Sequence, residues 1–338
     1  MNSSPDNPQT DTVTYGHTQF IHAKNRQVKE VQWLWRPFIP LGSITMLQGD
    51  GGSGKSTLAM KIAAMVSSGI VPPEIQHGRF QPAAHTDPAH VFYATTENDF
   101  DTSALPRFLR NGGNRDYFTA SDEELFHFSI ERNELKYVIK ELDARLVIID
   151  PLQAFLPRGV AMGNQTAVRE VFNEVNAVAA ETNTAILFIG HITKNERAKD
   201  IYRGFGSADI FAIMRSVLHF EEQSDKKPDA ARIVTQIKSN FDESYRRPFY
   251  VYQDPEDKSV QFFTSESELD KIDEDETDQG MTKAQEAEAF LKEMLSAGRI
   301  EAATINEQAK ELGIGRSTLY RAKKELGIET DDGFWTMG

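Results

Sequence analysis

The segment GDGGSGKS, Gly49 to Ser56, has the residue types and spacing of a loop that binds nucleotide phosphates, G-x-x-x-x-G-K-[ST]. Its glycines allow backbone N–H groups to surround phosphate oxygens without interference from Cβ atoms, and the N-terminus of a following helix adds partial positive charge. Lys55 would reach the β- and γ-phosphates of ATP, and the Ser56 hydroxyl would be a ligand of Mg²⁺. The predicted nucleotide-binding residues here are Gly49, Gly51, Gly52, Ser53, Gly54, Lys55, Ser56 and Thr57.

The alternative for this segment is a chance glycine-rich turn, and its surroundings argue against that alternative. The strand-like run SITMLQ (43–48) precedes the loop, and a helical pattern follows it from about residue 54 to residue 66. A strand, a glycine-rich loop and a helix in this order are the context that the phosphate-binding pattern requires.

A second candidate site residue is Asp150, which ends the apolar run RLVIID (145–150). An aspartate at the end of a buried strand can hold the shell of the Mg²⁺ that accompanies a bound nucleotide. The alternative is an ordinary aspartate in a turn after a strand. Pro151 follows directly, at the position where many nucleotide hydrolases carry a glutamate that activates water. A base for ATP hydrolysis must therefore come from elsewhere in the chain.

The missing base is expected on a neighbouring strand. The run HVFYAT (90–95) ends in Thr96-Glu97-Asn98-Asp99. Functional residues of doubly wound sheets gather at the carboxyl ends of the strands. We predict that Glu97 orients and deprotonates the attacking water, with Asp99 as a second candidate or a residue of the Mg²⁺ shell. The alternative for Glu97 is a solvated loop acid.

These residues require a sheet that brings several strand ends together. From Leu41 to about residue 190, β-rich runs alternate with helical patterns, which predicts a parallel sheet with helices on both faces. The expected strands are 43–48, 90–95, 126–130, 145–150 and 184–190, and the expected helices are 54–66, 134–142 and 165–182. After Arg215 strand follows strand, at 216–222, 231–238, 247–253 and 259–264. The fold class is therefore α/β, a doubly wound, mainly parallel sheet extended by antiparallel strands.

Composition limits the classes of protein to consider. The formal net charge of −14 is uneven, because residues 264–280 alone carry eight acids and one lysine. Such a segment reads as a solvated linker, so the net charge does not exclude a nucleic-acid partner. The chain has no cysteine, no apolar run of membrane-spanning length and no signal-peptide pattern at its start, and we expect a cytoplasmic protein without a membrane partner.

Four segments follow from these patterns. We expect a flexible N-terminal arm at 1–30, an ATPase domain at 31–264, an acidic linker at 265–280 and a small domain at 281–338. In the small domain, residues 301–327 read as helix, turn and helix, with Ile305 and Leu312 facing inward. The end IETDDGFWTM reads as a short β-wing, which completes a winged helix-turn-helix.

The second helix of this small domain would present basic side chains to DNA. Winged helices also dock proteins, and residues 281–338 carry eight basic and ten acidic residues, so docking of replication proteins stays open. The candidate DNA-binding residues of the tail are Arg316, Arg321, Lys323 and Lys324.

Between VQWLWRPFIPLGS (31–43) and KSNF (238–241) the chain resembles the RecA-fold ATPases of plasmids, phages and integrative elements. This family includes the RepA-type hexameric replicative helicases of plasmids. The resemblance rests on GDGGSGKST, ATTEND, LVIIDPLQAF, GHITKN and GFGSADIFAIMRSVL. It implies a RecA-like fold, ATP and Mg²⁺ as cofactors, and a homo-oligomer, most simply a hexamer, with single-stranded DNA in the ring channel.

The resemblance also implies roles for further residues. His191 of GHITKN would sense the γ-phosphate, although an ordinary strand-end histidine is the alternative. Arg215 matches the family's arginine finger, which stabilises transition-state charge in a neighbouring subunit. Lys238, on a later strand, would contact the nucleotide similarly; surface salt bridges are the alternative for both. A channel loop would touch DNA through Lys194, Arg197, Lys199 and Arg203, unless it is only a solvated charged loop.

The sequence therefore predicts an ATP-hydrolysing motor on DNA, a hexameric replicative helicase of a plasmid, phage or integrative element. The alternative is an ATP-switched DNA-binding or loader protein that oligomerises without unwinding. A small-molecule kinase fits less well, because the sequence shows no acceptor site and the finger-like Arg215 suggests subunit contacts.

Overall fold

The structure, a computed structural model, divides the chain into two compact units, Met1–Gln32 and Trp33–Gly338. It describes residues 12–15, 18–21, 23, 27–76, 79–81, 84–96, 100–121, 128–191, 208–222, 231–241, 248–254, 256–265, 268, 283–296, 298–331 and 333–337.

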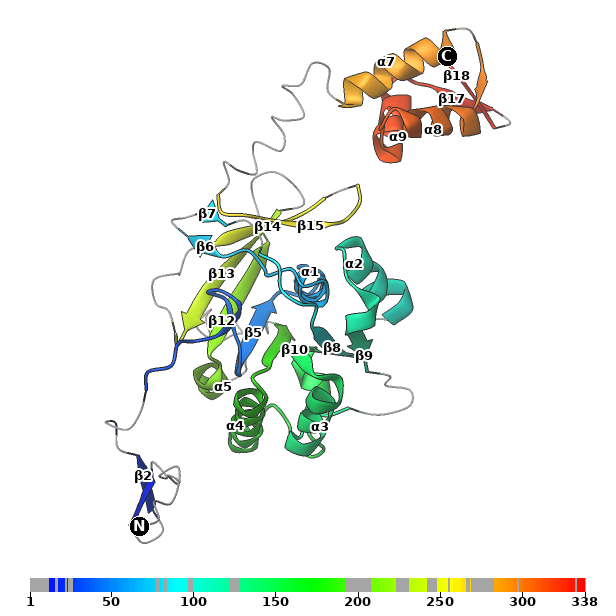
Figure 1. Cartoon of the computed structure of the whole chain (residues 1–338). Helices are drawn as coiled ribbons and strands as arrows, with labels where there is room; N and C mark the ends of the chain where they lie inside the picture. The colour runs from blue at the N-terminus through cyan, green and yellow to red at the C-terminus, as the bar shows by residue number, and fades with distance from the viewer. Residues whose placement is uncertain are drawn as a thin grey trace, which may run out of the picture. The chain divides into compact units, whose positions relative to one another are not determined.

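A nine-stranded sheet forms the centre of the second unit (Figure 1). Its order is β15-β14-β13-β12-β5-β11-β10-β8-β9. The six strands from β12 to β9 are parallel, and β13, β14 and β15 continue from β12 antiparallel. This confirms the predicted α/β class with a mainly parallel sheet. The parallel strands are β5 (Ser43–Gly49), β8 (His90–Thr95), β9 (Phe118–Ala120), β10 (Ala144–Asp150), β11 (Ala185–His191) and β12 (Ser216–Glu222). The antiparallel strands are β13 (Ala231–Ser239), β14 (Phe249–Gln253) and β15 (Val260–Phe263).

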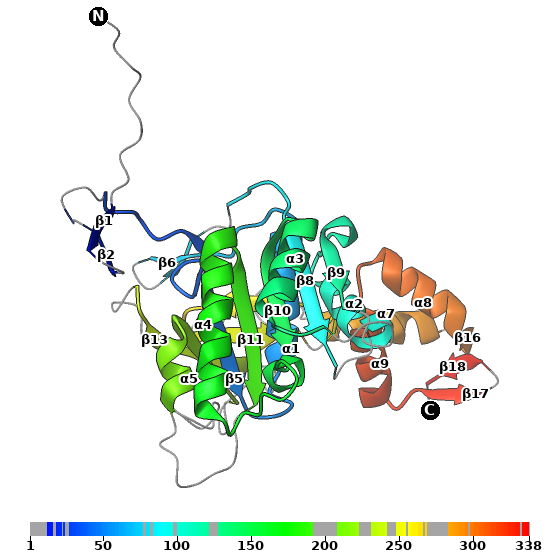
Figure 2. The same ribbon diagram turned by 90° about the horizontal axis from the view of Figure 1, so that it is seen from below.

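Helices cover both faces of this sheet, and Figure 2 shows α3 and α4 on one of them. One face packs against α1 (Lys55–Ser67) and α2 (Leu105–Arg110), and the other against α3 (Arg132–Leu142), α4 (Gln165–Thr182) and α5 (Ala208–Ile213). Shorter pieces are the π-helix Phe100–Ala104 and the 3₁₀ turns Arg115–Tyr117 and Leu152–Phe155. The two-stranded pairs are β3 (Trp33–Trp35) with β4 (Ile39–Pro40), and β6 (Ile75–Gln76) with β7 (Arg79–Phe80).

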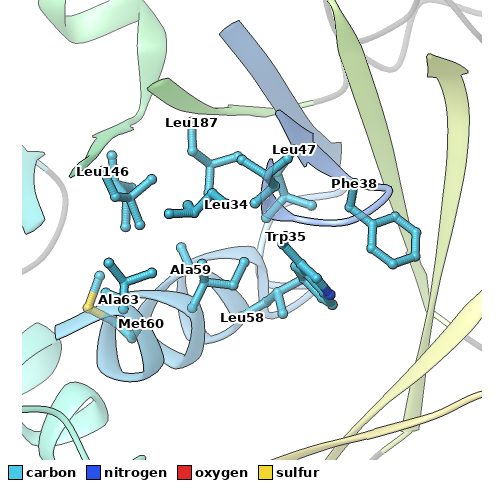
Figure 3. Close-up of a cluster of buried hydrophobic side chains, with 14 of the residues drawn as sticks. Leu34, Trp35, Phe38, Leu47, Leu58, Ala59, Met60, Ala63, Leu146 and Leu187 are labelled. Carbon is cyan, nitrogen blue, oxygen red and sulfur yellow. The ribbon is translucent and has the colours of Figure 1, made fainter. Parts of the chain in front are cut away.

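Helix α1 is held in place by apolar packing. Leu58, Ala59 and Ala63 belong to the same buried cluster as Leu146 and Leu187 of the central strands, and Ala59 and Ala63 lie on the side of that pair (Figure 3). All five side chains are fully buried, and burying a leucine stabilises a fold by roughly 1.5–3 kcal/mol. The start of α1, which carries Lys55 and Ser56, is therefore fixed against the end of β5.

One predicted strand is wrong. The run FHFSI was expected to form a strand at 126–130, but the described residues 128–130 have no strand conformation. The edge strand is β9 instead, which pairs with β8 from Phe118 to Ala120. Phe128 and Ile130 are nevertheless buried in the core on that face, where the Phe128 ring lies against the rings of Phe92 and Phe155. Their hydrophobicity serves packing without strand pairing.

The first unit contains a short hairpin of β1 (Thr12–Tyr15) and β2 (Thr18–Ile21). No such strands were expected, because the periodicity of residues 1–30 is weak. Adjacent strands joined by two residues need few long-range contacts, so a weak pattern suffices to form them.

The C-terminal part has a hydrophobic core of its own, which contains Leu291, Ile305, Leu319 and Trp335. Three helices and a three-stranded antiparallel sheet surround it, in the chain order α7 (Lys283–Leu295), β16 (Ile300–Glu301), α8 (Ala302–Glu311), α9 (Arg316–Glu325), β17 (Glu329–Asp331) and β18 (Phe334–Thr336). The predicted helix-turn-helix and terminal hairpin are present as secondary structure.

The prediction that Leu312 faces inward is wrong, because its side chain is 65% exposed. Ile305 is buried as predicted. The chain turns at Gly313, which has φ of +72°, and Ile314 enters the core in place of Leu312.

Across the described residues, the helices are all too short or too polar to span a bilayer.

Candidate nucleotide-binding site

The glycine-rich loop connects β5 to α1, as the sequence predicted. Gly54 caps α1 with φ of +105°, a left-handed conformation that side chains with a Cβ rarely adopt. At Gly49 the limit is space: a Cβ there would lie 2.4 Å from the carbonyl oxygen of Phe220 on β12. Close strand pairing and a sharp entry into the helix therefore require these two glycines.

Lys55 lies inside this loop. Its side chain is 3% exposed, and its ammonium donates to the carbonyls of Gly49 at 3.0 Å and Asp50 at 2.6 Å. The Ser53 hydroxyl oxygen lies 3.5 Å away. A buried cation among loop carbonyls, at a helix N-terminus, favours an anionic ligand such as a phosphate chain.

Ser56 and Asp150 meet beside the loop. The Ser56 hydroxyl donates to Asp150 Oδ2 at 2.6 Å, and Asp150 is fully buried at the end of β10. One hydroxyl and one carboxylate suit Mg²⁺, which keeps several waters and takes its other ligands from nucleotide phosphates. The side chains present therefore fit the Mg²⁺ of a bound nucleotide, and the metal-binding role of both residues stays a prediction.

A third residue of this cluster was missed. Tyr93 on β8 donates its hydroxyl to the same Asp150 oxygen, at 3.0 Å. In the sequence Tyr93 reads as one more apolar strand residue, and only the pairing of β8 with β10 brings it to Asp150.

Four strand ends meet at this edge of the sheet. Gly49 pairs with His191 of β11, and Asp150 pairs with Thr95 of β8. His191, the predicted γ-phosphate sensor, thus lies in the backbone register next to the phosphate loop. The predicted base Glu97 and the second candidate Asp99 lie outside the described residues, two and four positions after Thr95.

A cavity of about 380 Å³ borders the loop. A volume of this size suits a small ligand or part of a nucleotide. Apart from Gly52, Ser53, Gly54 and Thr57, no residue of its lining was predicted from the sequence, because the other lining residues come from α1, four strands and a turn. The additional lining residues are Leu58, Phe220, Arg232, Val251, Gln253, Lys258 and Val260.

Arg215 lies at the opposite end of the strands, where β12 begins. Its backbone N–H donates to the carbonyl of Ile44, at the start of β5, and the next residue begins β12. Strand β5 then pairs parallel with β12 from Thr45 to Gly49, where the phosphate loop begins. The length of this strand separates Arg215 from its own loop by roughly 15–20 Å.

Lys238 lies at the same far edge, paired in register with Val217. Its ammonium donates to the carbonyls of Phe211 and Ala212, at 2.7 and 2.8 Å, where α5 ends. Burial and then the positive charge of Arg215 lower the pKa of Lys238. Lys238 therefore lies at the end of the strands away from its own phosphate loop, and its predicted contact with nucleotide in the manner of Arg215 stays a prediction.

The predicted DNA-binding residues divide into two groups. Lys194, Arg197, Lys199 and Arg203 lie outside the described residues. In the tail, Arg321 and Lys324 are exposed on α9, the helix that Arg316 begins. Lys323 instead lies over the Trp335 ring, 4.7 Å from its centroid, and donates to the Thr330 hydroxyl. It therefore contributes to the packing of α9 on the terminal hairpin.

Comparison with known proteins shows similarity to RadA proteins. DNA repair protein RadA of Halalkalibacterium halodurans is 25% identical over 202 residues, which cover 59% of this chain and 37% of that protein. DNA repair protein RadA of Streptococcus pyogenes is 23% identical over 233 residues, 68% of this chain and 42% of that protein. The chain spans about two fifths of the length of these relatives.

These similarities support the RecA-like P-loop architecture expected from the motifs. They do not single out the RepA-type helicases among such proteins. The sequence profile of an AAA domain family, AAA_25, matches residues 9–197 of the 338 residues and includes the phosphate loop, Glu97, Asp150 and His191. Because this match spans more than half of the 338 residues, the chain belongs to the AAA domain family.

Proposed function

We propose that the chain is an ATP-hydrolysing motor that acts on DNA as a ring of identical subunits, a hexameric replicative helicase of a plasmid, phage or integrative element. The position of Arg215 is the observation that supports a ring of subunits. This arginine lies at the sheet edge away from its own phosphate loop, so it can stabilise a transferring phosphoryl group only in a neighbouring chain.

Within one active site, the residues of this chain would act as follows. The loop N–H groups and Lys55 bind the phosphates, and Ser56 and Asp150 hold the Mg²⁺ of the nucleotide. When bound, that ion neutralises charge on the β- and γ-phosphate oxygens. Glu97 orients the attacking water and accepts its proton, while Arg215 of the adjacent subunit faces the γ-phosphate. His191, beside Gly49, passes the state of the nucleotide to the loop that follows β11.

Three observations support DNA as the partner. The similar RadA proteins carry the name DNA repair protein. The basic residues from Lys194 to Arg203 follow directly on β11, which ends beside the phosphate loop. We expect this basic segment to couple the nucleotide to a strand of DNA. In the tail, Arg321 and Lys324 are exposed on α9, and their charges suit contacts with a phosphate backbone.

The experiment that tests this function measures steady-state ATP hydrolysis with and without single-stranded DNA. We expect DNA to raise turnover severalfold, and we expect the stimulation to decline as salt is added, because phosphate contacts release counterions. Lys55→Ala is the control, since it should abolish both basal and stimulated turnover. Slow turnover that is indifferent to DNA would contradict the motor and favour the ATP-switched loader.

A chain truncated to residues 31–264 tests the domain organisation. The core of the tail shares no residue with either core of the ATPase part, among the residues that the structure describes. We therefore expect the truncated chain to fold and to hydrolyse ATP, with its unfolding free energy changed by no more than about 1 kcal/mol. DNA or partner binding should weaken instead. Insoluble or inactive protein would show that the tail belongs to the ATPase core.

A further inference from the structure

Tyr93 lies in the centre of the ATPase part and yet bears a hydroxyl. Its side chain is fully buried, on a strand whose neighbours Val91, Phe92 and Ala94 are apolar. A phenylalanine would fill the same space without a polar atom to satisfy. Burying a hydroxyl is unfavourable unless it forms a hydrogen bond, so the bond from Tyr93 to Asp150 is what makes this residue tolerable there.

The ring of Tyr93 is fixed independently of that bond. It stacks on Phe118 with 6.2 Å between centroids and an angle of 19°. Phe118 stacks in turn on Phe108 at 4.0 Å and on Phe100 at 5.9 Å. Because this aromatic stack sets the ring, the Tyr93 hydroxyl is a stationary donor. Phe100 also begins the π-helix, three residues after Glu97 in the sequence.

Asp150 Oδ2 therefore accepts two hydrogen bonds, from Tyr93 at 3.0 Å and from Ser56 at 2.6 Å. The two donors restrain the rotation of the carboxylate about its last torsion. Ser56 uses its proton in this contact, which leaves the lone pairs of its oxygen for a cation. The arrangement is a pair of oxygen ligands whose orientation is set before a metal arrives.

We propose that Tyr93 is a positioning residue for the metal site: its hydroxyl holds Asp150 in the orientation that accepts the Mg²⁺ of a bound nucleotide. This inference rests on the proposed function, since it requires a metal–nucleotide complex at the phosphate loop. Partners that orient the ligands of a metal typically change metal affinity by about 10- to 100-fold when they are removed.

The test is Tyr93→Phe, which removes the hydroxyl and keeps the aromatic stack. Mn²⁺ replaces Mg²⁺ as the probe, and its binding in the presence of ADP is followed by the loss of the EPR signal of the free ion. We expect Tyr93→Phe to bind Mn²⁺ at least about tenfold more weakly. The affinity for ADP in EDTA should stay the same, because the loop and Lys55 are unchanged. Tyr137→Phe, at an exposed tyrosine of α3, is the matched control and should change neither affinity.

A second variant separates positioning from packing. Phe118→Leu disturbs the stack but keeps the Tyr93 hydroxyl, so we expect a lower melting temperature with a smaller loss of Mn²⁺ affinity than in Tyr93→Phe. The reverse ranking of the two variants would assign Tyr93 to the core alone. Equal Mn²⁺ affinity in wild type and Tyr93→Phe would overturn this inference and leave the proposed function standing. A wild-type chain that binds no Mn²⁺ with ADP would overturn both.

Discussion

An Arg215→Ala chain is expected to bind ATP with nearly wild-type affinity and to lose about three to five orders of magnitude in turnover, the usual contribution of an arginine finger. The physical reason is the separation between Arg215 and the phosphate loop of the same chain. Both ends of β5 are fixed by pairing with β12, so Arg215 cannot approach its own nucleotide without breaking the sheet. In the proposed ring its charge would act on the transition state in the next subunit, whereas binding would depend on the intact loop.

Mixing two inactive variants tests this arrangement directly. Lys55→Ala subunits keep the finger and lack the phosphate lysine, and Arg215→Ala subunits have the opposite defect. A mixed ring contains interfaces that pair an intact loop with an intact finger, so partial ATP hydrolysis should return. The size of the rescue depends on the coupling between sites, and a strictly concerted ring would show little.

The control for Arg215→Ala is Arg132→Ala, at an arginine of α3 that is paired with Glu181 on the surface. Such exposed pairs contribute at most about 1 kcal/mol, so turnover should be unchanged. An Arg215→Ala protein that keeps full turnover as an isolated monomer would rule out the finger in trans, and with it the main support for a ring.

Glu97→Gln is expected to bind ATP and to lose roughly two orders of magnitude or more in turnover, as for the loss of a general base. The register of β8 and β10 supports this prediction. Asp150 is followed by Pro151, and its register partner is Thr95, so β8 ends beside the metal-site carboxylate two residues before Glu97. A base in the segment after β8 therefore follows the strand end that lies beside Asp150. Single-turnover hydrolysis with excess enzyme measures the chemical step without interference from product release.

Asp99→Asn is the matched comparison for Glu97→Gln, because it removes one carboxylate in the same segment. We expect a smaller loss of turnover, with a shift in Mg²⁺ dependence if Asp99 belongs to the metal shell. Normal hydrolysis by Glu97→Gln together with inactive Asp99→Asn would transfer the role of the base to Asp99.

The sequence by itself determined the phosphate loop, the elements that flank it and the long helix α4. The strand before the loop, α1 and α4 follow from local patterns: an apolar run, a glycine-rich turn and helical periodicity, each contained within about 20 residues. The bounds of α4 agree with the predicted helix at 165–182. Asp150 was also predictable, because the end of a buried strand is visible in the chain as the point where an apolar run stops.

Only the tertiary structure decided which residues meet. Tyr93 and Asp150 are 57 residues apart, and the pairing of β8 with β10 makes them neighbours. The direction of β12 placed Arg215 and Lys238 at the far edge, where Lys238 caps α5 and cannot reach its own loop. In the same way β9, and not the equally apolar run around Phe128, completed the sheet. A local pattern reports how strongly a residue prefers burial, but not the strand beside which it is buried, because that choice depends on register and packing between distant segments.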